Sequence, residues 1–363
     1  MIETRAPGKL FIAGEYAVVE PGEPAILVAV DRYLSVRVSA SENSSGCIHS
    51  TAYGDQPRVW ARDDAGDRIV LEHAPVDFVA AAIDAVEELR AARGIEPRYF
   101  DLHIGSELDD PSGRKFGLGS SGAVTVAVIS ALEQFYGLGL TRLERFRLGL
   151  LTTIELSPRA SGGDIAASTY GGWIRYTSPD REALRAHRTA HGLPATMTAP
   201  LWDICTITPL PAPRTLELMV GWTGSPASTE RLVDGVQRSE QDHERQRALF
   251  RAGSRENVEV IVAALGADET PVQPAIRRVR RLLQELDAST GIRIETDRLR
   301  AMCDIVERHG AVAKPSGAGG GDCGIALVEP GTAQALIAED WVAHGIQHLA
   351  LTVHDPEEDG DGR

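Results

Sequence analysis

The residues best suited to chemistry lie between Lys115 and Val124, which read Lys-Phe-Gly-Leu-Gly-Ser-Ser-Gly-Ala-Val. Glycine lets a backbone approach a ligand closely and adopt positive φ angles at little cost. We expect Ser120 or Ser121 to cap a helix that begins here, because serine is a favoured N-cap residue. The first N–H groups of a helix lack internal partners and lie at the positive end of its dipole. The segment therefore predicts a phosphate-binding loop, and Lys115 adds a positive charge beside it.

Two other interpretations of this segment stay open. Residues 117–122 match the dinucleotide-binding pattern G-x-G-x-x-G, which should directly follow a buried strand in a βαβ unit. Residues 107–114 are polar instead, so a nicotinamide-dependent oxidoreductase is the disfavoured alternative. A P-loop needs a lysine directly after its glycines, and none follows here. The other interpretation, without chemistry, is a glycine-bearing loop that only starts a core helix.

The elements around this loop have recognisable patterns. Residues 121–136 are apolar on nearly every side, which predicts a helix buried in the middle of its domain. Residues 76–93 have apolar side chains at helical spacing, with Gly94 just after them as a stop signal. Residues 34–38 and 99–104 alternate between apolar and polar, as in half-buried strands.

A polar, irregular stretch at residues 179–200, followed by a cluster of prolines, predicts a domain boundary. The pair Gly171-Gly172 before it predicts a hairpin turn. Beyond the boundary we expect helices at 229–249, 257–265, 274–286 and 296–309, and strands at 216–221, 324–328 and 348–353. We therefore predict an N-terminal domain over 1–200, a C-terminal domain over 201–354 and an acidic, disordered tail over 355–363.

Length and composition limit the possible functions. A chain of 363 residues suggests two domains, and 43% hydrophobic with 25% charged residues is ordinary for a soluble enzyme. The net charge of −15 argues against a general binder of nucleic acid or of anionic membranes. No apolar run reaches the roughly 18 residues of a membrane span, and the start lacks a secretion signal. Four widely spaced cysteines predict a reduced, cytoplasmic protein, which we expect to be a monomer or a homodimer.

Two further segments raise the specificity of the prediction. Residues 6–16 read Ala-Pro-Gly-Lys-Leu-Phe-Ile-Ala-Gly-Glu-Tyr, and residues 314–323 read Lys-Pro-Ser-Gly-Ala-Gly-Gly-Gly-Asp-Cys. Together with the central loop they resemble, in order and spacing, the three motifs of the GHMP kinases, which include galactokinase, homoserine kinase and mevalonate kinase. Within that superfamily they are most similar to the bacterial phosphomevalonate kinases, and residues 221–229 add a fourth point of similarity.

This resemblance implies a fold and a reaction. The fold would be α+β with two domains, an N-terminal one like ribosomal S5 domain 2 and a ferredoxin-like C-terminal one, with the active site between them. The reaction would transfer the γ-phosphate of ATP to (R)-5-phosphomevalonate, with Mg²⁺, in the mevalonate route to isoprenoids. An acid at Asp322 favours this acceptor, but a sibling such as mevalonate kinase and a non-catalytic nucleotide sensor remain alternatives.

The resemblance also assigns roles to residues. Lys9 would lie near the acceptor, Asp164 would orient the acceptor oxygen or accept its proton, and Ser121 would contact Mg²⁺. Asp164 as a plain helix cap is the alternative. A second metal ligand is not found, because its expected place holds Thr153, and Glu155 is two positions away. The residues expected at the nucleotide are Lys115, Gly117, Leu118, Gly119, Ser120, Ser121 and Gly122. Those expected at the acceptor are Lys9, Tyr16, Lys115, Ser161, Ser228, Ser316, Gly317, Ala318 and Gly319.

Two features are set aside. His344 and His348 have the spacing of a metal-binding pair, but no third ligand lies nearby in the sequence. The arginine cluster at residues 277–281 is interpreted as a solvated helix face or an oligomer contact, because acidic residues follow it.

Overall fold

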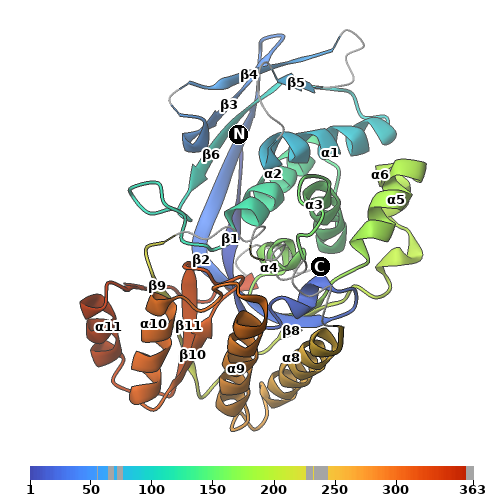
Figure 1. The fold of residues 1–363 in the computed structure, drawn as a ribbon. Coiled ribbons are helices and arrows are strands. Elements are labelled where there is room, and N and C mark those ends of the chain that lie inside the picture. Colours follow the sequence, from blue (N-terminus) through green and yellow to red (C-terminus); the bar gives the residue numbers. More distant parts are fainter. Residues whose placement is uncertain (55, 64–68, 72–76, 226–231, 233–243, 357–363) are drawn as a thin grey trace.

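The computed structural model describes residues 1–363 except 55, 64–68, 72–76, 226–231, 233–243 and 357–363 (Figure 1). The described residues form two β-sheets, and helices pack against each sheet. We call the first sheet with helices α1 to α6 the N-terminal lobe, and the second sheet with α8 to α11 the C-terminal lobe. The predicted α+β class is confirmed.

The first sheet is built around β2, the longest strand. Its strands are β1 (Ile2–Ala13), β2 (Pro24–Ala40), β3 (Gly46–Ser50), β4 (Arg58–Arg62), β5 (Ile69–Leu71), β6 (Phe100–Ser106), β7 (Trp173–Thr177) and β8 (Ile207–Leu210). They follow the order β5-β4-β3-β6-β2-β7-β8, and β1 pairs with β2. One edge of β2 pairs with β1, and the other pairs with β7 in its first part and β6 in its last part. All pairs are antiparallel except β3 with β6.

Helices cover one face of this sheet. They are α1 (Phe78–Ala92), α2 (Ser120–Tyr136), α3 (Arg142–Leu156), α4 (Gly163–Tyr170), α5 (Arg181–His191) and α6 (Leu193–Met197), with short 3₁₀ turns η1 (Ala17–Val19), η2 (Thr51–Tyr53) and η3 (Pro200–Trp202). Helix α2 packs against β1 and β2 and is surrounded by α1, α3 and α4. This central position explains why α2 is apolar on nearly every side, and it confirms the predicted buried helix.

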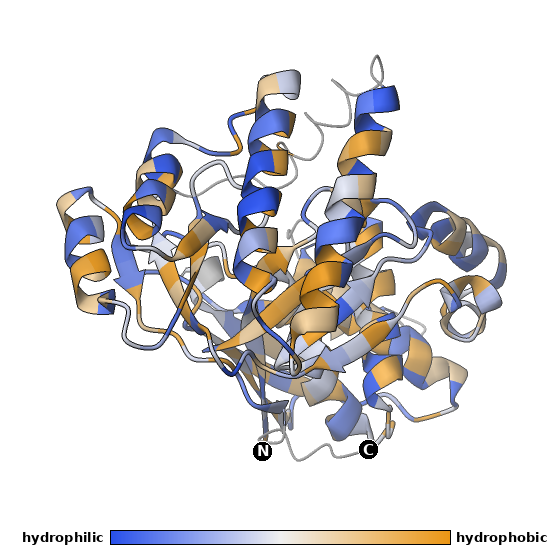
Figure 2. Cartoon of the chain, turned by 90° about the horizontal axis from the view of Figure 1, so that it is seen from below, coloured by the Kyte–Doolittle hydropathy of each residue, from blue (hydrophilic) through white to orange (hydrophobic). Residues whose placement is uncertain are grey.

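The second sheet has the order β10-β11-β9-β12, with every neighbour antiparallel. Its strands are β9 (Glu217–Trp222), β10 (Val312–Pro315), β11 (Cys323–Val328) and β12 (Gln347–Leu349). Its helices are α8 (Glu244–Ala264), α9 (Val272–Thr290), α10 (Asp297–Arg308) and α11 (Gln334–Ala343). The helices show polar and apolar sides in Figure 2, as expected where one side covers a core. The order and the helix placement are those of a ferredoxin-like unit.

Three predictions of local structure are wrong. Gly171 and Gly172 connect helix α4 to β7 and form no hairpin, since α4 runs through Tyr170. Most of the stretch at 179–200 is helical, as α5 and α6, because Asp180 caps α5 by accepting the Ala183 N–H at 2.9 Å. The break expected between helices at 229–249 and 257–265 is also wrong, because one helix, α8, runs through residues 250–256. Gly253 inside it leaves room for Leu282 of α9. Residues 229–231 and 233–243 lie outside the described part.

Most other predicted elements are confirmed within a few residues. They are the strands at 99–104, 216–221 and 324–328 and the helices at 76–93, 121–136, 274–286 and 296–309. The strand predicted at 34–38 is confirmed only as the last part of β2, which already begins at Pro24. No helix among the described residues is long and apolar enough to cross a membrane. The domain boundaries remain predictions; β8 still belongs to the first sheet, and residues 357–363 of the tail lie outside the described part.

The strand predicted at 348–353 is only partly correct, because the chain leaves β12 after Leu349 and returns to the first sheet. Val353 bridges to Val30 of β2, and the N–H of His354 donates to the carbonyl of Ala29 at 3.0 Å. Asp31 accepts from both the N–H and the hydroxyl of Thr352, at 2.7 and 2.8 Å. This segment fills the edge of β2 between its pairings with β7 and β6.

We therefore expect that ending the chain after Ala350 lowers the free energy of unfolding by about 2–4 kcal/mol, since each lost hydrogen bond is worth roughly 0.5–1.5 kcal/mol. Urea unfolding followed by circular dichroism measures the change. A chain that ends after Pro356 is the control and should match the full chain. Equal stability of both shortened chains would contradict the prediction.

Candidate active site

The loop before α2 leaves the start of this helix without a side-chain cap. Gly119 is the N-cap residue, with φ of 80°, and among the described residues no side-chain cap accepts from the first turn. The expected serine cap is therefore wrong, because Ser120 and Ser121 are the first two helical residues. Gly117 also has a positive φ, 83°, which favours glycine. The uncapped N–H groups and the positive end of the dipole suit an anion.

Lys9 and Asp164 both lie close to Gly119 of this loop. The backbone N–H of Lys9, on β1, donates to the carbonyl of Leu118 at 2.8 Å, and its Nζ donates to Gly117 at 3.4 Å. A Cβ added at Gly119 would lie 2.9 Å from Cε of Lys9 and 3.5 Å from Cβ of Asp164. The glycine therefore makes room for both side chains.

The carboxylate of Asp164 faces the first turn of α2. A Cβ added at Gly122 would lie 2.7 Å from Oδ2 of Asp164. Asp164 sits in the first turn of α4, whose N-cap is Gly162, and its Oδ1 accepts from the N–H of Ile165 at 3.0 Å. Asp164 is thus not the N-cap residue of α4, and its second oxygen points toward the loop.

The third sequence segment forms the turn between β10 and β11, residues 316–322, which we call the glycine loop. The hydroxyl of Ser316 accepts from the N–H of Phe11 at 2.9 Å and donates to its carbonyl at 3.1 Å. Tyr16 donates its hydroxyl to the carbonyl of Ala318 at 2.6 Å. A Cβ at Gly117 would lie 2.6 Å from Cβ of Asp322, so the glycine loop also meets the loop before α2. The three segments converge on one place, between the lobes.

A buried ion pair joins the first and third segments. Nζ of Lys314 donates to Oε1 of Glu15, and the side chains are 0% and 2% exposed. The other oxygen of Glu15, Oε2, is buried without a hydrogen-bond partner among the described residues. We did not predict this pair. Both residues belong to the segments that carry the family resemblance, but nothing in the sequence indicates that they touch.

Two arginines that the sequence did not single out hold the segment after β9. Arg114 donates to the carbonyl of Gly224 at 3.1 Å, and Arg298 donates to the carbonyl of Thr223 at 2.8 Å. Lys115, next to Arg114, is exposed beside the loop, as a contact for a charged ligand requires. The only sequence signal for Arg114 was its place beside Lys115.

The other residues considered for the site lie partly near Asp164 and partly away from it. The hydroxyl of Ser161 accepts from the N–H of Gly163 at 3.2 Å, so it stands at the start of α4, close to Asp164. Ser228 lies outside the described residues. Glu155 is exposed and pairs with Arg188 at 3.7 Å, while Thr153 is buried in α3. The described residues contain no cluster of three His, Cys, Asp or Glu that could hold a metal.

Burial raises the pKa of the Asp164 carboxyl, while Lys9 and the N–H of Ile165 oppose this rise. A raised pKa means that the folded chain holds the proton more tightly than the unfolded chain does. The ionised carboxylate therefore lowers stability at neutral pH. This cost is absent below the ordinary carboxyl pKa, about 3.9, and complete above the raised pKa of the folded state.

We expect D164N to increase the free energy of unfolding at pH 7.5 and to change it much less near pH 4, close to the ordinary carboxyl pKa. Urea unfolding at both pH values measures the difference. The exposed Asp203 offers a matched control, and D203N should change the free energy of unfolding at pH 7.5 by no more than about 0.5 kcal/mol, as is usual for surface substitutions. A D164N chain that is less stable than the parent at pH 7.5 would show that the carboxylate is not penalised by burial.

Comparison with known proteins places the chain in a family. Residues 77–172 match the model of the GHMP kinases N-terminal domain, and residues 261–347 match that of the GHMP kinases C-terminal domain. A phosphomevalonate kinase of Streptomyces sp. (strain CL190) is 44% identical, over 97% of this chain and 96% of the relative. A mevalonate kinase of Pyrococcus horikoshii is 30% identical, over 94% and 92%.

Solved structures agree with this assignment. The Streptococcus pneumoniae phosphomevalonate kinase in complex with phosphomevalonate and AMPPNP superposes with a TM-score of 0.84 at 28% identity, over 97% of this chain and 100% of that one. A Lin0012 protein from Listeria innocua gives a TM-score of 0.89 at 36% identity, over 96% and 97%. The resemblance inferred from three short segments is therefore confirmed over the full fold, and the chain belongs to the GHMP kinase family.

Proposed function

We propose that this chain is a phosphomevalonate kinase, which transfers the γ-phosphate of ATP to (R)-5-phosphomevalonate and yields (R)-5-diphosphomevalonate and ADP. The observation that carries phosphoryl transfer is the meeting of Lys9 and Asp164 at the uncapped start of α2. The choice of acceptor rests on similarity, since the Streptomyces phosphomevalonate kinase is 44% identical and the Pyrococcus mevalonate kinase 30%.

The start of α2 is the proposed place for the phosphates of ATP. Its first N–H groups lack intrahelical partners, and in the described part of the chain no side-chain cap satisfies them. The positive φ angles of Gly117 and Gly119 let the backbone before the helix turn tightly around an anion. The hydroxyls of Ser120 and Ser121, both half-buried in the first turn, are further donors. Such a site binds a polyanion without any basic side chain, and Lys115 adds one.

Lys9 and Asp164 act on the acceptor in this proposal. Phosphoryl transfer needs alignment and neutralisation of charge more than covalent help from the protein. The Lys9 ammonium reduces the repulsion between the acceptor phosphate and the γ-phosphate of ATP. The acceptor phosphate is already largely ionised at pH 7, so we propose that Asp164 helps to orient the attacking oxygen and does not need to remove a proton from it.

Mg²⁺ fits the chemistry of the groups present. The carboxylate of Asp164 faces the start of α2, and the side chain of Asp322 lies against Gly117. Mg²⁺ prefers oxygen ligands and is bound in kinases by one or two carboxylates together with substrate phosphates. We propose that Ser121 and one of these carboxylates hold the ion, with the phosphates. When bound, Mg²⁺ neutralises the charge that develops on the transferred group.

The alternatives lose support. A dinucleotide-binding loop directly joins a strand to a helix in a βαβ unit whose two strands lie side by side. Here β6 ends at Ser106, well before α2 begins at Ser120, and β6 and β7 each pair with β2 instead of with each other. A non-catalytic nucleotide sensor would not need Lys9 and Asp164 together at the loop. Mevalonate kinase activity remains the second candidate, because several mevalonate kinases match most of this chain at 25–30% identity.

We also propose that the reaction takes place in the cytoplasm. All four cysteines, Cys47, Cys205, Cys303 and Cys323, are free thiols, which suits a reducing compartment.

An acceptor screen tests this function. We expect ATP-dependent release of ADP with 5-phosphomevalonate and Mg²⁺, and little with mevalonate or 5-diphosphomevalonate. K9M and D164N should each lower kcat by about 10²–10⁴-fold, the range typical of a lost acid–base or orienting group. Circular dichroism should show that both variants are folded. Turnover of mevalonate in preference to 5-phosphomevalonate would overturn the proposed acceptor.

Gly122 offers a second test of the geometry. In G122A the new methyl group would meet the carboxylate of Asp164, which must move, so we expect kcat to fall at least tenfold. The fold should persist, because alanine favours a helix. G253A is the matched control, since Gly253 also lies inside a helix and its added Cβ would meet only the side chain of Leu282, at 3.2 Å. Similar kcat values in the two variants would argue against a fixed place for Asp164.

A further inference from the structure

The glycine loop is held from three sides. Phe11 and Tyr16 of the N-terminal lobe hold it through Ser316 and Ala318, as described above. The third support comes from the C-terminal lobe, where the N–H of Gly320 donates to the carbonyl of Ile294 at 2.8 Å. Gly319 lies so close that a Cβ there would overlap the same carbonyl oxygen. The position of Ile294 therefore limits where the glycine loop can lie.

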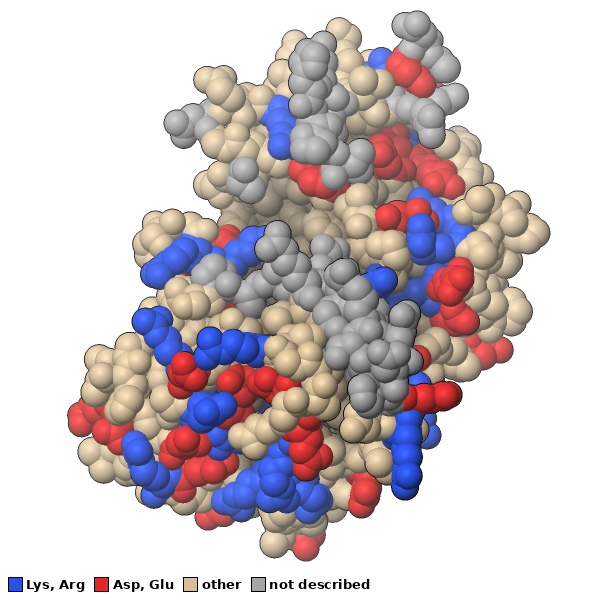
Figure 3. Space-filling model, in the orientation of Figure 1, with Lys and Arg blue, Asp and Glu red and all other residues tan. Residues whose placement is uncertain are grey.

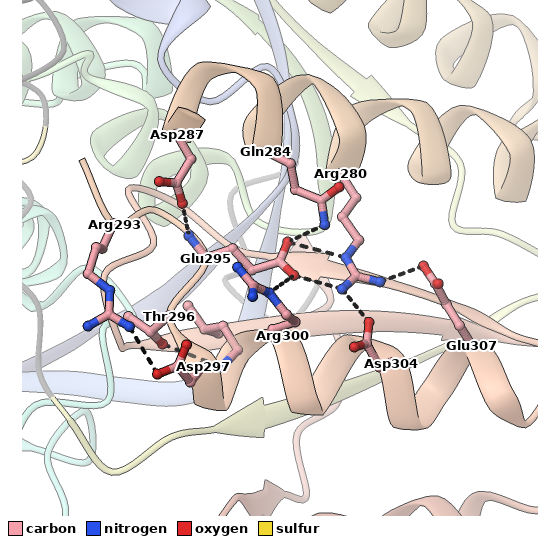
Figure 4. Close-up of polar contacts among 11 residues, drawn as sticks. Arg280, Gln284, Asp287, Arg293, Glu295, Thr296, Asp297, Arg300, Asp304 and Glu307 are labelled. Carbon is pink, nitrogen blue, oxygen red and sulfur yellow. Dashed lines mark hydrogen bonds and ion pairs between the residues drawn. The ribbon is translucent and has the colours of Figure 1, made fainter. Parts of the chain in front are cut away.

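Ile294 is fixed by its neighbour Glu295, which is anchored to α9 (Figure 4). Arg280 donates to both carboxylate oxygens of Glu295, at 3.2 and 2.7 Å. Gln284 donates to Oε2 of Glu295 at 3.1 Å, and Asp287 accepts from its N–H at 3.0 Å. The side chain of Glu295 is only 1% exposed, so these contacts replace its hydration completely.

Arg280 also reaches α10. Its guanidinium contacts Asp304 at 2.6 Å and Glu307 at 2.8 Å, so one side chain ties α9, the segment before α10 and α10 itself together (Figure 4). Burial alone would lower the pKa of Arg280, but its hydrogen bonds to Glu295 and Asp304 raise it above its ordinary value, and the arginine stays charged.

The sequence-based interpretation of residues 277–281 as a solvated face or oligomer contact is therefore wrong for Arg280, which is 6% exposed. Two neighbouring arginines also form hydrogen bonds within the protein: Arg277 donates to the carbonyl of Ala311, and Arg278 donates to the side chain of Asn257. Elsewhere on the face shown in Figure 3, basic and acidic side chains of the C-terminal lobe are mixed. The charge pattern, a cluster of arginines followed by acidic residues, did not distinguish the buried arginine from exposed ones.

We propose that Arg280 and Glu295 are positioning residues for phosphoryl transfer, which fix the Ile294 carbonyl and through it the glycine loop. The inference rests on the proposed function, because it takes the glycine loop to contact the acceptor. Neither side chain is among the residues proposed to contact a substrate. A shift of about 1 Å in a positioning element can lower a rate by about 100-fold, so a remote ion pair can matter for catalysis.

The test replaces the pair by apolar residues. Removal of one partner alone would leave a buried charge unpaired and could unfold the protein, whereas replacement of both by apolar side chains is often tolerated. The variant is R280M/E295L. The matched control is R145M/E133L, because Arg145 and Glu133 form another ion pair, 13% and 6% exposed, between α3 and α2 of the N-terminal lobe.

Two measurements are made at a temperature where both variants are folded. The first is kcat and KM for ATP and 5-phosphomevalonate. The second is amide hydrogen exchange of a peptide covering residues 313–323 in the free protein, which requires no activity. For R280M/E295L we expect kcat/KM to fall about 10–100-fold and exchange in the glycine loop to become faster. For R145M/E133L, kcat/KM and the exchange rate of the glycine loop should both stay within about twofold of the parent values, even if this variant is less stable than the parent.

R280K completes the series, because lysine keeps the charge but cannot bind both carboxylate oxygens. We expect intermediate values of kcat/KM and exchange, and this variant decides the question if R280M/E295L does not fold. Unchanged loop exchange in the Arg280 variants, or an equal loss of kcat/KM in the control, would overturn the inference. If the parent protein does not phosphorylate 5-phosphomevalonate, the proposed function is overturned instead. The exchange data would still test whether Arg280 fixes the glycine loop.

Discussion

The site depends on one steric constraint: the Asp164 carboxylate, the Lys9 side chain and the backbone that starts α2 must share a very small space. Gly119 and Gly122 permit this, because any side chain there would collide with Lys9 or Asp164. The same closeness gives the site its electrostatics. A carboxylate removed from water is costly, and the lysine and the nearby N–H groups offset part of that cost. Gly119 and Gly122 are thus needed because they leave room for the two charged side chains, more than because glycine is flexible.

Both lobes contribute residues to this site, and these residues contact one another. Strand β1 and the turn after it supply Lys9, Phe11, Glu15 and Tyr16, and the last three contact the third segment in the C-terminal lobe. A buried pair such as Glu15 with Lys314 adds little net stability, but it strongly penalises any arrangement in which the partners separate. The contacts therefore favour one relative position of the glycine loop and α2.

The sequence pattern predicted the helices and strands whose formation depends mainly on residues close together in the chain. The apolar run predicted α2, and the alternation predicted β6 and the last part of β2, whose buried first part does not alternate. Three short segments were sufficient to predict the family. What the sequence could not supply were contacts between distant residues. Ile294, Glu295 and Arg280 carry no motif, and they matter only because folding places a carbonyl under the glycine loop. Gly119 as N-cap was missed for a related reason: serine is the better cap in isolation, but the loop geometry requires a positive φ one residue earlier.

The return of residues 351–354 to β2 has a consequence for folding during synthesis. Thr352 is 321 residues away from its partner Asp31, so it leaves the ribosome long after the rest of the first sheet has been translated. Until then the middle of one edge of β2 has no strand beside it, and open strand edges are where chains associate wrongly. Contacts of such long sequence separation also form slowly. The nascent chain thus passes through a long interval in which its most central strand is incompletely paired.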